Sequence, residues 1–195
     1  MGLPGYDKEN RSKSFEVLPK GAYVVKIRRA RLDQNSNGNG QHITIAFDIA
    51  EGEQKDFYQK VFDANTKEDK KWPNDGIFYL NVPTDSSPDF IKKNWDSFFA
   101  DLEDSNDGFV FDAAKADMDT LKGKLIGGKF ANEQSEYNGK VYDHMKMRWT
   151  CTAQAVREGK AGRLPNDKLI QTTPSSSNGF MNIDTSVDDD EIPFA

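Results

Sequence analysis

The stretch "QHITIAFDIAEG" (41–52) is the clearest indication of the fold class. Apolar and polar side chains alternate strictly along it, with Ile43, Ile45, Phe47 and Ile49 on one face and His42, Thr44, Ala46 and Asp48 on the other. A period of two is typical of a β-strand with one buried face. The preceding segment "AYVVKIRRARL" (22–32) is rich in β-branched residues and predicts a second strand. Because "NSNGNG" (35–40) has turn chemistry, we expect the two strands to form a hairpin.

Further elements follow outward from this hairpin. The segment "KDFYQKVFD" (55–63) predicts a third strand, and "IFYLNV" (77–82) a short strand or a segment packed on the sheet. Ser87 and Pro88 provide an N-cap and a first-turn proline for a helix at about 88–103, whose apolar residues Ile91, Trp95, Phe98 and Leu102 recur at helical spacing. The segments 121–130 and 140–157 flank an Asn138-Gly139 turn, which predicts a final hairpin.

This order of elements predicts a mainly β protein. Three strands, a helix and a two-stranded hairpin form the plan of the OB-fold, a five-stranded Greek-key barrel with one helix between strands 3 and 4. Other small barrels and α+β sheets also accommodate it. We assign residues 1–17 to an N-terminal arm and residues 18–160 to the OB-fold domain. Residues 161–195 are assigned to a disordered linker and acidic tail, because such polar sequence cannot bury enough apolar surface to fold alone.

Several classes of protein are excluded by the composition. Charged residues make up 30% of the chain, and no apolar run approaches the length of a membrane span. The first 21 residues lack the apolar stretch of a secretory signal. Cys151 is the only cysteine, so no internal disulfide can form. We therefore expect a cytoplasmic protein.

The net charge of −6 is unevenly distributed along the chain. Residues 171–195 hold five acids and no Lys or Arg, and residues 85–119 hold ten acids and three lysines. The remaining sequence carries 23 basic and 17 acidic residues. An acidic protein can therefore present a basic face.

Three predicted strands have an apolar face opposite a face of Lys, Arg and Tyr. The apolar faces comprise Tyr23, Val25 and Ile27, then Phe57 and Val61, then Val141, Met145, Met147, Trp149, Cys151 and Ala153. Cations along a groove and aromatic rings on which bases stack are typical of single-stranded nucleic-acid binding. The alternative is an ordinary solvated outer face. The predicted DNA-binding residues are Lys26, Arg28, Tyr58, Lys60, Trp72, Lys140, Tyr142, Lys146 and Arg148.

Other residues near these positions have simpler interpretations. Arg29 and Arg31 have the opposite parity to Lys26 and Arg28, which indicates either a bulge or a strand end that has left the barrel. Trp72 suits a stacking residue and a hydrophobic lid equally, whereas Trp149 and Cys151 are expected in the core. The histidines His42 and His144 lack a metal-ligand pattern, so no cofactor is expected. Because no nucleophile, base and orienting group occur together, the sequence does not predict an enzyme.

The chain ends in "VDDDEIPFA" (187–195), where four acids precede apolar residues. The acids raise encounter rates with basic patches, and the apolar side chains suit a small pocket on a partner protein. The alternative is an acidic tail that only aids solubility. The predicted partner-binding residues are Asp188, Asp189, Asp190, Glu191, Ile192, Pro193 and Phe194.

The segment "DDDEIPF" (188–194) resembles the C-terminal tip of bacterial single-stranded DNA-binding proteins, which ends Asp-Asp-Asp-Ile-Pro-Phe and recruits replication and repair partners. Two departures are the inserted Glu191 and the additional Ala195, which takes over the terminal carboxylate. The segments 18–27 and 121–142 are similar to phage-encoded single-stranded DNA-binding proteins.

The resemblance implies an OB-fold that protects single-stranded DNA during phage replication, recombination or repair. It places the protein in the cytoplasm of a bacterial host, where a homo-oligomer is compatible with the sequence. A second hypothesis is an OB-like adaptor that binds only proteins. The two differ in whether an oligo-dT strand is bound.

Overall fold

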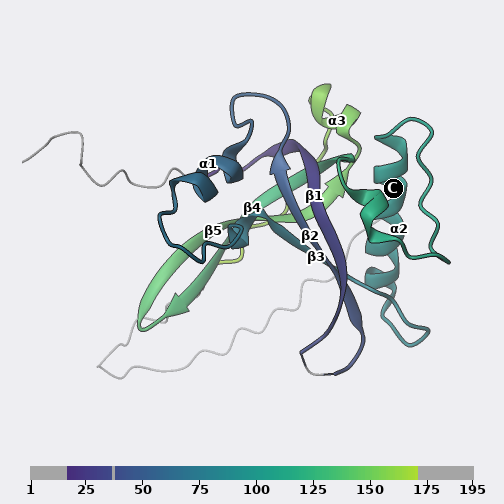
Figure 1. Cartoon of the computed structure of the whole chain (residues 1–195), viewed down its shortest axis with the longest axis horizontal. Helices are drawn as coiled ribbons and strands as arrows, with labels where there is room; N and C mark the ends of the chain where they lie inside the picture. Colours follow the sequence, from purple (N-terminus) through teal and green to yellow (C-terminus); the bar gives the residue numbers. More distant parts are fainter. Residues whose placement is uncertain (1–16, 37, 171–195) are drawn as a thin grey trace, which may run out of the picture.

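The computed structural model describes residues 17–36 and 38–170. Its strands are β1 (Ala22–Gln34), β2 (Gln41–Ile49), β3 (Ile77–Asn81), β4 (Leu125–Tyr137) and β5 (Lys140–Cys151). The α-helices are α1 (Phe57–Ala64), α2 (Asp89–Asp104) and α3 (Ala153–Arg157), and the short 3₁₀ helices are η1 (Asn74–Gly76) and η2 (Met118–Leu121). In Figure 1 the β1–β2 and β4–β5 hairpins project from the core in different directions, and α2 lies to one side.

The five strands form one antiparallel sheet in the order β3-β2-β1-β4-β5. The prediction of a mainly β protein with two hairpins and a helix near 88–103 is confirmed. The sheet is not closed, since no ladder joins β3 to β5 within the described residues. The two end strands nevertheless lie close together, because one cavity is lined by both Leu80 of β3 and Trp149 of β5.

The prediction of a third strand at 55–63 is wrong, because residues 57–64 form helix α1 and the edge strand is β3. The expected inward residues Phe57 and Val61 are four positions apart, a spacing that fits both a strand and one turn of a helix. Asp56 adopts a positive φ of 58° and reverses the chain before the helix begins.

Helix α1 begins against the carboxylate of Asp48. The Oδ1 atom accepts from the backbone N–H groups of Ile49 and Tyr58, both at 2.9 Å, and Oδ2 accepts from Gln59 N at 3.2 Å. Burial raises the pKa of Asp48, although these three donors favour the charged form. A polar strand residue thus becomes the cap of the following helix.

The core lies on the inner face of the sheet and is closed by helices. The Phe47 ring makes edge contacts with Tyr58 of α1 at 5.5 Å and with Phe130 of β4 at 5.8 Å, and all three side chains are buried. Helix α2 buries Phe98, Phe99 and Leu102, and Phe98 stacks on Phe78 of β3 at 6.1 Å. Both helices therefore contribute to one core.

Two register shifts change which side chains face outward. In β1 the shift lies between Ile27 and Arg29, which confirms the bulge considered for this strand and leaves Arg28, Arg29 and Arg31 all exposed. In β5, Met147 pairs with Phe130 and Trp149 pairs with Lys129, so β5 advances by two residues where β4 advances by one. Each bulge reverses the parity of the residues that follow it.

Three predictions for the last strand need correction. Trp149 is not a core residue, because the β5 bulge turns it outward and leaves it 44% exposed. Val141 is also exposed. Residues 153–157 form helix α3, whose N-cap Thr152 accepts from Ala155 N, instead of extending the strand. Cys151 is half-buried, and burial raises the pKa of its thiol.

The segment after α3 returns to the sheet. Lys168 pairs with Glu133 in a parallel bridge, with backbone hydrogen bonds from Lys168 N to Asn132 O and from Gln134 N to Lys168 O. The predicted linker, residues 161–195, includes Lys168, so its first part contacts the sheet. The predicted partner-binding residues 188–194 and nearly all of the predicted N-terminal arm lie outside the described residues. Across the part of the chain that is described, none of the helices has the length and apolar character that crossing a membrane requires.

Candidate nucleic-acid interface

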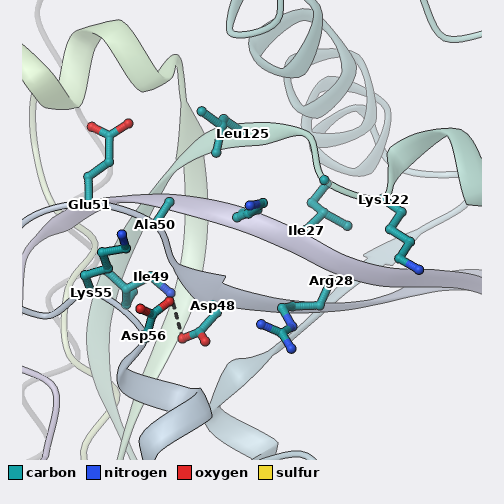
Figure 2. Close-up of a pocket in the computed structure, with 12 residues that line it drawn as sticks. Ile27, Arg28, Asp48, Ile49, Ala50, Glu51, Lys55, Asp56, Lys122 and Leu125 are labelled. Carbon is teal, nitrogen blue, oxygen red and sulfur yellow. Dashed lines mark hydrogen bonds between the residues drawn. The ribbon is translucent and has the colours of Figure 1, made fainter.

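A cleft of about 600 Å³ lies beside β1, the end of β2 and the turn before β4. Lys26, Arg28, Lys55 and Lys122 line it, and we call these four residues the cation cleft. Figure 2 shows the side chains of Arg28, Lys55 and Lys122 around the cavity, on three separate segments of the chain. The fold thus gathers positive charge that is dispersed in the sequence.

Asp48, Glu51 and Asp56 also line the cleft, and the first two of these acids have partners within the protein. Asp48 caps α1. Glu51 forms a bidentate ion pair with Arg157, whose Nη2 donates to Oε1 at 2.6 Å and whose Nε donates to Oε2 at 3.0 Å. Hydrogen bonding to Arg157 lowers the pKa of Glu51.

The four cations themselves are not paired with acids. Within residues 17–36 and 38–170, none of them lies within 4.0 Å of a carboxylate oxygen. Arg28 is near enough to Asp48 for its charge to oppose the burial that raises the pKa of that carboxyl, so Lys26, Lys55 and Lys122 are the charges most available to an external anion such as a phosphate.

Arg28 is held in place by two neighbours. Its Nη2 donates to Gln59 Oε1 at 2.8 Å, and its guanidinium carbon lies 5.2 Å from the centroid of the Trp72 ring. Trp72 also packs on Phe62 at 5.7 Å and donates from Nε1 to Gly76 O at 3.2 Å. Since the ring is half-buried and already contacted by Arg28 and Phe62, the geometry favours the lid interpretation of Trp72 over the stacking one.

The prediction that Tyr58 points outward to stack on a base is wrong. Tyr58 is 1% exposed and packs between Phe47 and Phe57, and burial raises the pKa of its hydroxyl far above the usual value. Lys60, on the same helix, is exposed and donates to Lys55 O at 2.9 Å, so it lies beside the cation cleft.

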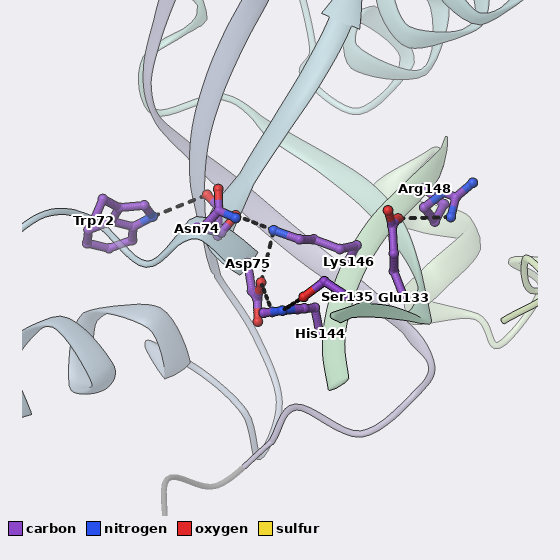
Figure 3. Close-up of polar contacts among 9 residues, drawn as sticks. Trp72, Asn74, Asp75, Glu133, Ser135, His144, Lys146 and Arg148 are labelled. Atoms are coloured by element: carbon purple, nitrogen blue, oxygen red, sulfur yellow. Dashed lines mark hydrogen bonds and ion pairs between the residues drawn. The ribbon is translucent and has the colours of Figure 1, made fainter. Parts of the chain in front are cut away.

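Lys146 and Arg148 form ion pairs (Figure 3). The Lys146 ammonium lies 2.9 Å from Asp75 Oδ1 and donates to Asn74 O at 2.8 Å, which ties β5 to η1. Arg148 Nη1 lies 3.1 Å from Glu133 Oε2. A phosphate would have to displace these carboxylates, so both residues are weaker candidates than the cation cleft.

His144 lies between Asp75 and Ser135, an order similar to a catalytic triad (Figure 3). Its Nδ1 is 3.2 Å from Asp75 Oδ1, and its Nε2 is 2.9 Å from Ser135 Oγ. The Lys146 ammonium on Asp75 offsets the carboxylate charge that would stabilise an imidazolium during catalysis. The cluster therefore serves better as a link between β5 and η1 than as a nucleophile.

Lys140 and Tyr142 lie near the turn of the β4–β5 hairpin, and both are exposed. Lys140 lies six positions before Lys146, a distance of about 20 Å along the strand at the usual rise per residue. Neither Lys140 nor Tyr142 is among the residues that line the cation cleft.

Several candidate residues were missed by sequence reasoning. Lys55 and Lys122 belong to the cation cleft through loops whose positions no local pattern predicts. The ladders also place Arg31, Thr44 and Tyr79 in one row across β1, β2 and β3, and Tyr79 is 53% exposed. The signal for Tyr79 was present, since it alternates with inward residues in 77–82.

The sequence matches no family model and no curated protein. The chemistry of the site is therefore inferred from its charges, rings and shape. Among the described residues, no group of three or more His, Cys, Asp and Glu is arranged to hold a metal ion. The surface combines cations with an exposed aromatic side chain, Tyr79, which suits an anionic polymer with flat groups.

Proposed function

We propose that this protein binds single-stranded DNA, largely without sequence specificity. The observation that carries the proposal is the cation cleft, with four cations and no ion pair to any of them within the described residues. Phosphate contacts supply the sequence-independent part of nucleic-acid affinity. Arg29 follows Arg28 on β1 and is exposed, whereas Arg31, in the row with Thr44 and Tyr79, is ion-paired with Asp33 at 2.8 Å.

The sheet supports a more specific proposal, a partly open OB-fold barrel. Its order places β3 and β5 at the two ends, a helix lies between β3 and β4, and both end strands line one cavity. In OB-folds, oligonucleotides bind across the face of strands 2 and 3. Tyr79 and Thr44 lie on that face here.

The proposed role is non-catalytic protection of DNA during phage replication, recombination or repair in a bacterial host, with the acidic tip recruiting partner proteins. A protein-only adaptor is the second candidate. The ion pairs of Lys146 and Arg148 favour it, because they remove two predicted phosphate contacts.

Binding of the full-length protein to a fluorescent oligo-dT strand separates the two candidates. We expect affinity for the single strand that falls with salt, with a log–log slope of about −0.7 per phosphate contact, and weaker binding to a duplex of equal length. If the folded protein binds no oligonucleotide at low salt, the DNA-binding proposal is wrong and the adaptor is favoured.

Deleting residues 187–195 should leave DNA binding intact or tighten it at low salt, because four acids tethered to the same chain can compete with phosphate for its basic surface. The same deletion should abolish capture of replication proteins from the host. Phe194→Ala keeps every acid and should abolish capture without changing the DNA affinity. Capture by the Phe194→Ala protein at the wild-type level would show that the tip is only an acidic tail.

A further inference from the structure

A second cavity, of about 370 Å³, lies where the two ends of the sheet meet helix α2. We call it the aromatic groove. Residues 78–81 of β3, the first turns of α2, Lys129 of β4 and residues 148–150 of β5 line it. Its volume lies within the range of small-ligand sites.

Three aromatic side chains in the aromatic groove are exposed. Tyr79 is 53% exposed, Phe90 63% and Trp149 44%. Trp149 faces outward only because of the β5 bulge, and Phe90 lies in the first turn of α2, apart from the helix's buried residues Phe98, Phe99 and Leu102. Rings from β3, α2 and β5 thus converge although no core requires them there.

The charged side chains that line the aromatic groove are positive among the residues the structure describes. In that part of the chain, Lys129 and Arg148 are its only ionisable lining residues apart from Tyr79, and the polar remainder consists of Asn81, Asn94, Ser97 and Thr150. Arg148 shares its charge with Glu133, which does not line the cavity. Flat apolar surface with the cation of Lys129 and two amides matches a base attached to a phosphate.

We propose that the aromatic groove holds unpaired nucleobases of the bound strand, with Trp149 as the main stacking residue and Lys129 toward the phosphates. This inference rests on the proposed function. Tyr79 belongs both to this groove and to the row with Arg31. A DNA strand that lies on the outer face of β2 and β3 can therefore reach the aromatic groove. Because bases in a duplex are stacked and paired, the groove accepts single strands only.

The test is the affinity of full-length variants for oligo-dT. Trp149→Ala should weaken binding roughly 5- to 140-fold, which corresponds to one stacked base. Phe90→Ala, at the most exposed of the three rings, should weaken it less. Tyr137→Ala is the matched control, since that ring is 69% exposed but does not line the groove, and its affinity should be unchanged. Melting curves establish that each variant is folded.

Photo-cross-linking with a 5-bromouracil oligonucleotide gives a second measurement that needs no substitution. The inference predicts cross-links to Trp149 or Tyr79 in the wild-type protein. Wild-type affinity of folded Trp149→Ala, with cross-links elsewhere, would overturn the inference and leave the proposed function standing. A synthetic peptide of residues 184–195 that protects Trp149, where oligo-dT does not, would overturn it in favour of a peptide site. Absence of any oligonucleotide binding by the wild type would overturn both proposals.

Discussion

Replacing Lys26, Arg28 and Lys122 together by Gln should weaken binding to oligo-dT on the order of 100-fold at about 50 mM salt. Each phosphate contact contributes about 0.7 to the log–log salt slope for a single strand, so the slope should fall in magnitude by about 2. The loss should shrink as salt rises, because screening removes the same attraction in the wild type. Fluorescence anisotropy over a salt series measures both quantities.

The control for this experiment carries the same change in charge at other places. Lys93, Lys115 and Lys160 are lysines outside the cation cleft, and the last two are ion-paired with Asp112 and Glu158. Replacing these three by Gln should change affinity and slope much less. Equal losses in both triple variants would mean that only net charge matters and that the cation cleft is not the phosphate site.

Tyr58→Ala should lower the free energy of unfolding by about 3–5 kcal/mol, the usual cost of removing a large buried ring. For a domain of this size that corresponds to a fall in melting temperature of roughly 6–20 °C. The physical reason is the contact of Tyr58 with Phe47 and Phe57 in the core. Thermal unfolding followed by circular dichroism measures the change.

Tyr58→Phe separates the ring from its hydroxyl. The hydroxyl is buried and has no hydrogen-bond partner among the described residues, so its removal should leave stability unchanged or raise it by about 1 kcal/mol. DNA affinity should equal that of the wild type. A stable Tyr58→Ala protein with weakened DNA binding would instead restore the stacking role predicted for an exposed tyrosine.

The elements that were predicted correctly have sequence patterns long enough to distinguish a strand from a helix. Nine residues of strict alternation in β2, the turn residues of 35–40 and 138–139, and sixteen residues of helical spacing in α2 each allow one interpretation. Segment 55–63 allows two interpretations, because its apolar residues Phe57 and Val61, four positions apart, fit both a strand and a helix. Its conformation depends on Asp48, which caps α1 from a strand that ends before it.

The candidate site shows the same division more strongly. The sequence by itself determined strands β1, β2, β4 and β5, the hairpin turns, helix α2 and the outward cations Lys26 and Arg28, because backbone period and turn chemistry act over a few residues. Only the tertiary structure decided that Trp149 is exposed, that Asp75 pairs with Lys146, and that Lys55 and Lys122 join the cation cleft. A bulge is set by the pairing of two strands, and an ion pair or a cleft by segments far apart in the chain, so neither leaves a periodic trace in the sequence.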